Sequence, residues 1–194
     1  MTLKFTTAKQ TKEAAYKAIT PFTRVHGRPT YGKRTMLREQ ALKKLGGVDT
    51  PYSDWGLIGE LAKDREFTRL TGERKYEAQE EPDEQHPDIE DARGDEIAIR
   101  RLEALNIEAQ QAWCVRKGAL QGICAQYRRA VDEKYYKHLE KRIVGYKGVT
   151  IREYFDHLNE VWVRVSTKVV KEARDQYFCG WKVGNSECIL KFGK

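Results

Sequence analysis

The segment DEKYYKHLEKRIVGYKGVTIREYFDHL, residues 132–158, decides the fold of this chain. It joins a basic, tyrosine-containing helix end, a turn at Gly145-Tyr146 and a second, amphipathic helix. Thr150 and Glu153 have the capping-box spacing, in which two residues satisfy each other's backbone N–H groups. We therefore predict that a helix begins at Thr150, within an all-α fold.

The helix predicted after Thr150 has one continuous apolar face, because its apolar residues recur at spacings of three and four. The candidate assembly or core residues on this face are Tyr154, Phe155, Leu158 and Trp162. Arg152 and Asp156 are predicted to pair across a turn on another face. Residues 161–165 also alternate like a strand, which leaves the helix end open. The pattern resumes at Val169, so we predict two shorter C-terminal helices.

A long helix is predicted before residue 132, because apolar residues from Leu102 to Ile143 recur mainly at spacings of three and four. Gly118 and Gly122 lie inside it, and each costs roughly 1 kcal/mol relative to alanine. They indicate either a bend or a close approach by another backbone. We favour a break near Gly118, and we expect the helix to end by Gly145.

The first half of the chain is predicted to be rich in loops, with short helices. Nine prolines and glycines fall between Pro21 and Gly59. Residues 35–45 have a helical apolar pattern that Gly46 ends, and residues 52–61 are predicted to pack onto this helix. The last residues, from 181 to 192, are compatible with a hairpin across Gly184-Asn185.

Charge divides the chain into basic, acidic and basic parts. Residues 1–76 carry 16 Lys/Arg against 8 Asp/Glu, residues 77–99 carry ten acids against Arg93 alone, and the remainder carries 19 against 11. This distribution suits a protein that meets a polyanion and needs an internal or inter-subunit counter-charge; the alternative is a solvated, disordered acidic linker. We predict four parts, namely a basic loop-rich region (1–76), an acidic Pro-containing linker (77–94), a helical core (95–178) and a tail of uncertain role (179–194).

Composition restricts the cellular class of the protein. The N-terminal sequence has no apolar run typical of a signal peptide, and unbroken apolar segments such as residues 161–163 are far too short to span a membrane. The four cysteines have no CxxC spacing and are too few for a disulfide scaffold. We expect an intracellular protein without a membrane partner, in which the cysteines pack as small apolar groups.

Basic residues around the end of the long helix are candidate RNA contacts, since phosphates require only a cationic surface. Lys134, Lys137 and Lys141 are predicted to share one helix face. The complete candidate set is Arg128, Arg129, Lys134, Lys137, Lys141, Arg142 and Lys147. The alternative is a solvated face in which Glu133 pairs with Lys137. Nearby tyrosines, Tyr135, Tyr136 and Tyr146, are suited either to stacking on unpaired bases or to the core.

Catalytic patterns are poorly represented in the sequence. Cys124 with His138 gives a nucleophile and a base, and Glu153 with His157 gives two metal ligands, but each pair lacks the third member that such chemistry needs. His157 is better explained as a structural histidine paired with Glu153. Neither P-loop nor dinucleotide glycine spacing occurs. We predict no enzyme activity, no cofactor, no metal and no small-molecule substrate.

Several short motifs follow one another in an order that resembles the Gag-like region of copia-type LTR retrotransposons. The similarity spans roughly residues 22–178. The motifs are Gly27-Arg28-Pro29-Thr30, Gly56 with Gly59, Tyr135-Tyr136, Gly145-Tyr146, Val149-Thr150 and Asp156-His157-Leu158. The sequence departs from the family in a loop, residues 54–59, that has fewer glycines. It also contains no CCHC zinc knuckle and no protease, integrase or polymerase motif.

The resemblance implies a structural function. In such elements this region is the all-helical capsid part of Gag, which assembles into virus-like particles around the RNA of the element. The implied partners are copies of the chain itself and retroelement RNA, in cytoplasmic particles or in the nucleus. The alternative is a monomeric or dimeric helical nucleic-acid-binding module, which would share the charge pattern but stop at a small oligomer.

Overall fold

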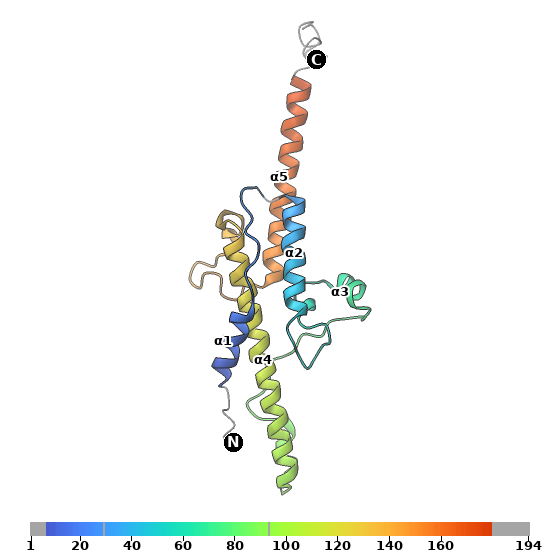
Figure 1. Ribbon diagram of the computed structural model, residues 1–194, viewed down its shortest axis with the longest axis vertical. Helices are drawn as coiled ribbons and strands as arrows, with labels where there is room; N and C mark the ends of the chain where they lie inside the picture. The colour runs from blue at the N-terminus through green and yellow to red at the C-terminus, as the bar shows by residue number, and fades with distance from the viewer. Residues whose placement is uncertain (1–6, 29, 93, 180–194) are drawn as a thin grey trace.

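The computed structural model describes residues 7–28, 30–92 and 94–179 and confirms the all-α fold class (Figure 1). The α-helices are α1 (Ala8–Ala18), α2 (Tyr31–Gly46), α3 (Asp64–Thr71), α4 (Glu96–Ala130) and α5 (Ile151–Cys179). Short 3-10 turns separate them: η1 (Ile58–Glu60), η2 (Pro87–Ile89), η3 (Glu133–Tyr135) and η4 (Lys137–Leu139). In the described residues the one β-type pairing is an isolated bridge between Lys141 and Gly145. The hairpin predicted near the C-terminus lies outside the described residues.

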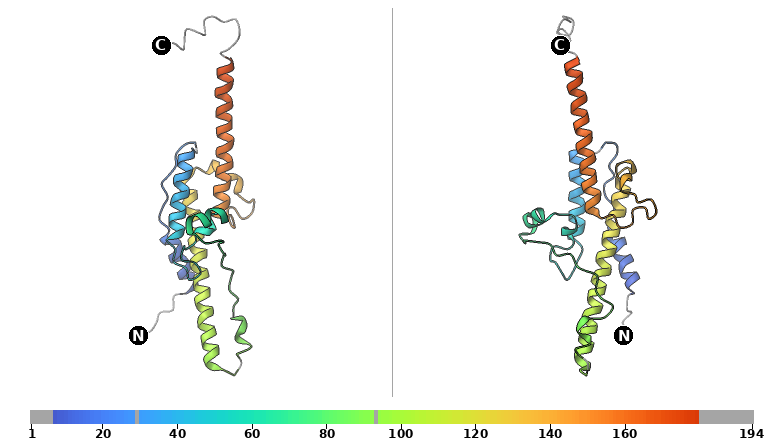
Figure 2. Two further views of the ribbon diagram at one scale, coloured as in Figure 1. Left: turned by 90° about the vertical axis from the view of Figure 1, so that its right-hand side faces the viewer. Right: turned by 180° about the vertical axis from the view of Figure 1, so that it is seen from behind.

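The molecule is elongated, and two of its helices extend beyond a central body (Figures 1 and 2). The body forms where α1, α2, the C-terminal half of α4 and the N-terminal half of α5 meet. The N-terminal half of α4 projects from one end of this body, and the C-terminal half of α5 projects from the other. The two projecting segments therefore point in opposite directions.

Helix starts follow from capping side chains. The predicted capping box at α5 is confirmed, since Thr150 N donates to Glu153 Oε2 at 2.6 Å and Glu153 N donates to Thr150 Oγ1 at 3.2 Å. Asp95 caps α4, because its Oδ1 accepts from the backbone of Ile97 and of Ala98, each at 3.0 Å. These caps satisfy N–H groups that have no partner inside a helix.

An aromatic cluster forms the centre of the body. Tyr127 of α4 is fully buried, and its ring centroid lies 4.9 Å from that of Tyr154 and 5.2 Å from that of Phe155, both on α5. The Tyr127 hydroxyl donates to the Tyr154 carbonyl at 3.2 Å, so this buried phenol is paired. Leu158 extends the same buried face. Three of the four residues predicted for an assembly or core face therefore lie in the core of the chain itself.

The two glycines within α4 mark a close helix contact and not a break. The helix runs unbroken through both, so the predicted break near Gly118 is wrong. A Cβ atom at Gly118 would lie 2.2 Å from the Lys12 carbonyl oxygen, and one at Gly122 would lie 2.8 Å from that of Tyr16. The backbone of α1 occupies the space that larger side chains would need. Of the two explanations offered by the sequence, the close approach is confirmed.

The boundaries of the later helices differ from those predicted. The long helix ends at Ala130, fifteen residues before Gly145, because Val131 and Tyr136 turn back into the core and Val25 N donates to the Ala130 carbonyl at 2.8 Å. The predicted pair of short helices is one helix, α5, whose apolar pattern continues through the ambiguous stretch 161–165. Helical spacing therefore outweighs local alternation there.

The helix predicted at residues 35–45 and the packing of residues 52–61 onto it are confirmed. The pattern of residues 35–45 lies within α2, which ends at Gly46. Leu57 and Leu61, from the segment predicted to pack on it, are buried, and Leu57 N donates to the Leu45 carbonyl at 2.9 Å. Arg116 of α4 also fixes this segment, through an ion pair with Glu60 at 2.6 Å.

The acidic linker lies along the projecting half of α4. We name residues 77–95 the acidic strap. Gln79 Nε2 donates to the Ala109 carbonyl at 3.2 Å, and Trp113 Nε1 donates to Glu81 Oε1 at 3.1 Å. Asn106 Nδ2 donates to the Glu84 carbonyl at 3.0 Å. Polar contacts thus attach a segment whose composition alone suggests a free linker.

Candidate nucleic-acid interface

The connection between α4 and α5, residues 131–150, carries most of the predicted RNA contacts. Two 3-10 turns occupy its first part, and a tight turn closed by the Lys141–Gly145 bridge occupies its second. Both backbone hydrogen bonds of that bridge measure 2.8 Å. Gly145 has φ +58°, a left-handed conformation that suits glycine. The connection is therefore an ordered loop with a defined tip.

Aromatic side chains anchor this connection to the body. Tyr136 is 6% exposed, and its hydroxyl donates to the Arg128 carbonyl at 3.1 Å. The Tyr146 ring centroid lies 5.3 Å from that of Tyr136, and the Tyr146 hydroxyl is buried. Tyr136 therefore belongs to the core, and Tyr146 is partly buried and packs against it. Tyr135 is only partly buried, with Lys134 Nζ 5.0 Å from its ring centroid.

Six of the seven predicted cations are exposed. They are Arg129, Lys134, Lys137, Lys141, Arg142 and Lys147. Arg128 is half-buried instead: its Nη1 donates to the Tyr154 hydroxyl at 3.0 Å, and its guanidinium lies 5.5 Å from the Tyr146 ring centroid. Arg128 therefore supports the aromatic core and is poorly placed to reach a phosphate.

The geometry predicted for the lysines is wrong. Lys134, Lys137 and Lys141 cannot share a helix face, because α4 ends at Ala130 and the three residues fall in η3, η4 and the following turn. The expected helical pairing of Glu133 with Lys137 loses its basis for the same reason. Five exposed cations lie instead along an irregular segment of 14 residues, from Lys134 to Lys147.

A second basic segment adjoins this connection and was missed by sequence reasoning. Residues 23–38 carry five Lys/Arg and no Asp/Glu. The Val25–Ala130 hydrogen bond places this segment against the end of α4, and Arg24 and Arg28 are exposed there. The run of cations without acids was the available signal, but no sequence pattern indicated that it would lie beside residues 131–150.

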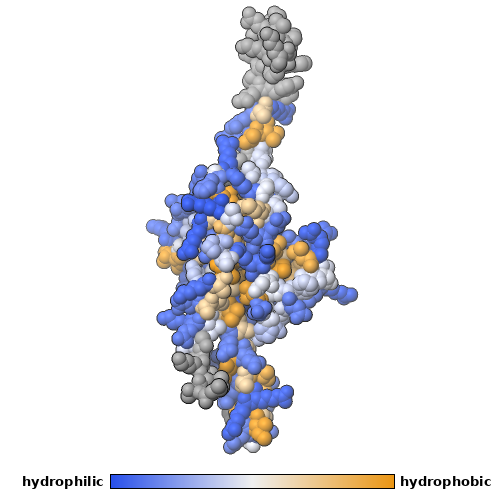
Figure 3. All heavy atoms as spheres, viewed as in Figure 1, coloured by the Kyte–Doolittle hydropathy of each residue, from blue (hydrophilic) through white to orange (hydrophobic). Residues whose placement is uncertain are grey.

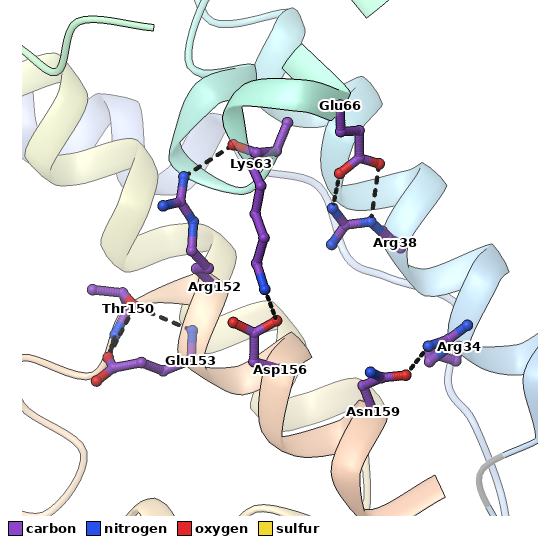
Figure 4. Close-up of polar contacts among 10 residues, drawn as sticks. Arg34, Arg38, Lys63, Glu66, Thr150, Arg152, Glu153, Asp156 and Asn159 are labelled. Carbon is purple, nitrogen blue, oxygen red and sulfur yellow. Dashed lines mark hydrogen bonds and ion pairs between the residues drawn. The ribbon is translucent and has the colours of Figure 1, made fainter. Parts of the chain in front are cut away.

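Other cations nearby hold the fold together, as Figure 4 shows. Arg152 Nη2 donates to the Gly59 and Ala62 carbonyls at 2.7 and 3.0 Å, and Asp156 pairs with Lys63 at 3.2 Å. The predicted Arg152–Asp156 pair is therefore wrong, because both side chains reach across to the segment between η1 and α3. Arg38 with Glu66, and Arg34 with Asn159, extend these contacts along α2.

Trp162, the fourth residue of the predicted assembly or core face, lies at the edge of the body. Its ring is partly buried, with its centroid 5.9 Å from that of Tyr31 on α2. The Arg34 guanidinium lies 5.0 Å from the Trp162 ring centroid, within range of a cation–π interaction. Trp162 therefore closes the contact between α2 and α5 and is not a free surface residue.

The rejected catalytic pairs have no chemical support in the structure. Burial raises the pKa of the Cys124 thiol to about 12, which keeps it protonated at neutral pH. Glu153 bonds to Thr150 and not to His157, whose Nε2 atom is buried without a hydrogen-bond partner. The expected Glu153–His157 pair is therefore wrong. In the described ranges, no group of three or more His, Cys, Asp or Glu side chains is arranged to hold a metal ion.

Comparison with protein-family models, curated proteins and solved structures finds no significant match to this chain. Among the residues that the structure describes, no helix is both long and apolar enough to cross a membrane. The case for a function therefore depends on the residues themselves and on the resemblance of their motif order.

Proposed function

We propose that this chain is a non-enzymatic Gag-like capsid protein that self-assembles and packages retroelement RNA. One observation carries the proposal: five exposed cations lie within Lys134–Lys147, beside Arg24 and Arg28 of the second basic segment, residues 23–38. The proposal places the particles in the cytoplasm, with the nucleus as the alternative location.

The proposed RNA contact is to phosphates and not to bases. Lysine and arginine at an exposed, irregular loop attract any polyanion, and the affinity depends on counterion release. Of the three tyrosines considered for stacking on bases, Tyr136 is buried, and Tyr135 and Tyr146 are partly buried and pack against the core. Recognition independent of sequence is what packaging of a long RNA requires.

The proposed self-assembly uses surfaces outside the core. Tyr154, Phe155 and Leu158 are at most 4% exposed within a single chain, so they are already covered. Large apolar side chains are exposed instead on the projecting helices and on the connection. They are Ile97, Leu105, Ile107, Ile143, Val144, Val163, Val169 and Val170. Exposed apolar groups of this kind are typical of interaction surfaces when they cluster.

An RNA-binding titration tests the first half of the proposal. The test variant replaces four connection cations with glutamine: Lys137→Gln, Lys141→Gln, Arg142→Gln and Lys147→Gln. We expect weaker binding of single-stranded RNA and a shallower dependence of log K on log salt, by about 0.7 for each phosphate that the variant no longer neutralises. Fluorescence anisotropy at several salt concentrations measures both quantities.

A matched control removes the same charge from elsewhere. The control variant carries Arg100→Gln, Arg164→Gln, Lys168→Gln and Lys171→Gln, all at exposed helix positions. We expect it to keep most of the affinity and the salt slope of the wild-type chain. If the two variants lose affinity equally, net charge alone drives binding, and the assignment to the connection is wrong.

A second candidate function is a monomeric or dimeric nucleic-acid-binding module. The burial of the apolar face of α5 favours it, because residues first considered for assembly are used inside one chain. It predicts the same RNA binding and salt dependence but a small, fixed oligomer. The mass of the particle in solution distinguishes the two candidates.

A further inference from the structure

Two exposed apolar surfaces lie at opposite ends of α4. The first is the tip of the connection, where Ile143 is 95% exposed and Val144 is 50% exposed. The second, named here the α4 end, contains Ile97, 82% exposed, and Leu105, 47% exposed. Figure 3 shows apolar surface at both places, at the lower end of the molecule and on its left side. Neither surface is covered by other residues in the described part of the same chain.

The connection tip is a preformed, positively charged turn. The Lys141–Gly145 bridge holds the turn, so Ile143 is presented without further ordering of the loop. Lys141, Arg142 and Lys147 lie within four residues of Ile143 in the sequence and are exposed. An apolar residue with exposed cations near it is suited to bind an apolar surface that has carboxylates near it.

The α4 end has that complementary character. Ile97 and Leu105 lie two helical turns apart, on a side of α4 that the acidic strap leaves uncovered. The strap and the projecting helix, residues 77–108, carry twelve carboxylates against three arginines, a balance of −9. The connection, with the end of α4 (residues 128–147), carries seven cations against three carboxylates, a balance of +4. The two apolar surfaces therefore have surroundings of opposite charge.

One chain cannot bring its own two surfaces together. The 35 residues of α4 separate them, and at 1.5 Å per residue this helix is roughly 50 Å long. We propose that the connection tip of one copy docks on the α4 end of a second copy. This inference rests on the self-assembly half of the proposed function and names the contact that would produce it.

The contact joins two different surfaces, so it is head-to-tail. Each copy then offers a free tip at one side and a free α4 end at the other, so assembly continues until a ring closes, or grows as an open filament where the geometry does not close. Other exposed cations, among them Arg129, Lys134 and Lys137, lie outside the tip and stay accessible to RNA. Assembly through opposite charges also weakens as salt rises.

Two complementary variants test the proposal. One removes the tip, with Ile143→Ser and Val144→Ser, and the other removes the α4 end, with Ile97→Ser and Leu105→Ser. All four side chains are substantially exposed, so the fold is expected to survive, as circular dichroism checks. Each variant alone should associate at least about tenfold more weakly than the wild-type chain, since less apolar area is buried between copies.

Mixing the two variants gives the decisive result. Each retains the surface that the other lacks, so an equimolar mixture should form 1:1 dimers that cannot grow, as measured by light scattering. A control variant, Leu70→Ser on α3, changes an apolar side chain that is 43% exposed and outside both surfaces, and it should assemble like the wild-type chain. Assembly of either double variant at wild-type strength would overturn the proposal, and so would a mixture that stays monomeric.

The same experiment separates this inference from the proposed function. If the wild-type chain assembles and the double variants do so equally well, self-assembly stands and the named contact is wrong. If the wild-type chain is monomeric at every concentration and with RNA, the contact and the self-assembly half of the proposed function both fail. RNA binding is measured separately, also on the two double variants, because Lys141, Arg142 and Lys147 belong both to the tip and to the candidate RNA contacts.

Discussion

The two halves of α4 belong to one helix but have different environments. All of its buried residues lie between Gly118 and Ala130, where α1, α5 and the connection surround it. Residues 96–117 contain no buried residue, and the acidic strap contacts this half mainly through polar hydrogen bonds. We name these the packed half and the projecting half.

The residues of α4 that stabilise the fold and those that are available for association lie in different halves of the helix. The packed half uses small residues and one tyrosine, Tyr127, which allow close contact and aromatic packing. The projecting half keeps isoleucine and leucine in solvent, at an energetic disadvantage for an isolated chain. Substitutions in the packed half should therefore change folding, and those in the projecting half should change association.

The largest effect is expected at Tyr127, the centre of the aromatic cluster. Tyr127→Ala removes a fully buried ring and its hydrogen bond, and should lower the free energy of unfolding by about 3–5 kcal/mol. The matched change in the projecting half, Ile97→Ala, should stay within about 0.5 kcal/mol. Urea denaturation of both variants measures this. Equal losses would break the distinction between the two halves.

A smaller loss is expected where α1 crosses α4. Gly118→Ala places a Cβ atom 2.2 Å from the Lys12 carbonyl oxygen. The helices must separate, which should cost about 1–3 kcal/mol despite the better helix propensity of alanine. The control is Gly32→Ala in α2, where a Cβ atom would meet no atom within 4 Å; it should stabilise the chain by up to about 1 kcal/mol. If both substitutions stabilise, α1 does not pack as described.

A still smaller loss of stability is expected from a substitution that weakens the attachment of the acidic strap. Trp113→Phe removes the donor to Glu81 while keeping most of the apolar ring. We expect a loss of about 1 kcal/mol or less, together with faster amide exchange in residues 79–90, measured by hydrogen exchange with mass spectrometry. Exchange in the packed half of α4 should not change. Unchanged amide exchange in residues 79–90 would mean that the other contacts of the acidic strap are enough to hold it on α4.

The smallest expected effect is a pH dependence at His157, on the side of α5 that faces the connection. Burial lowers the pKa of His157 below its usual 6.5, and its Nε2 has no partner. The unfolded chain therefore binds this proton more readily than the folded chain. Stability should be full above pH 6.5 and decline as pH falls through 6.5. The variant His157→Gln should show a flatter profile, in unfolding midpoints between about pH 7.5 and 5.5, above the range where carboxylates titrate. An equal decline in both proteins would assign the effect to other groups.

Much of the fold could be predicted from local patterns. The capping box at Thr150, the helix ending at Gly46 and the apolar face of α5 are all encoded by spacing. The end of α4 could not be predicted, because Tyr136 and Val131 turn back into a core that forms only when distant segments meet. Gly118 was ambiguous for a related reason, because a glycine inside a helix is compatible both with a bend and with a close contact.

The candidate site was predicted in composition but not in geometry. The basic residues after α4 are exposed, as a nucleic-acid surface requires, but they do not form a helical face. Arg128 was misassigned, because its partner Tyr154 is 26 residues away in sequence. The basic segment at residues 23–38 was missed, because its place beside the connection depends on a contact between residues 25 and 130.

Size-exclusion chromatography with light scattering, at low and high salt and with and without RNA, tests the central claim most directly. The claim is that this chain assembles through surfaces outside its packed core and binds RNA through its exposed connection. It predicts large particles, or a series of assemblies, that RNA promotes and that high salt weakens. A monomer or dimer of constant mass under every condition would contradict it and leave the nucleic-acid-binding module as the surviving function.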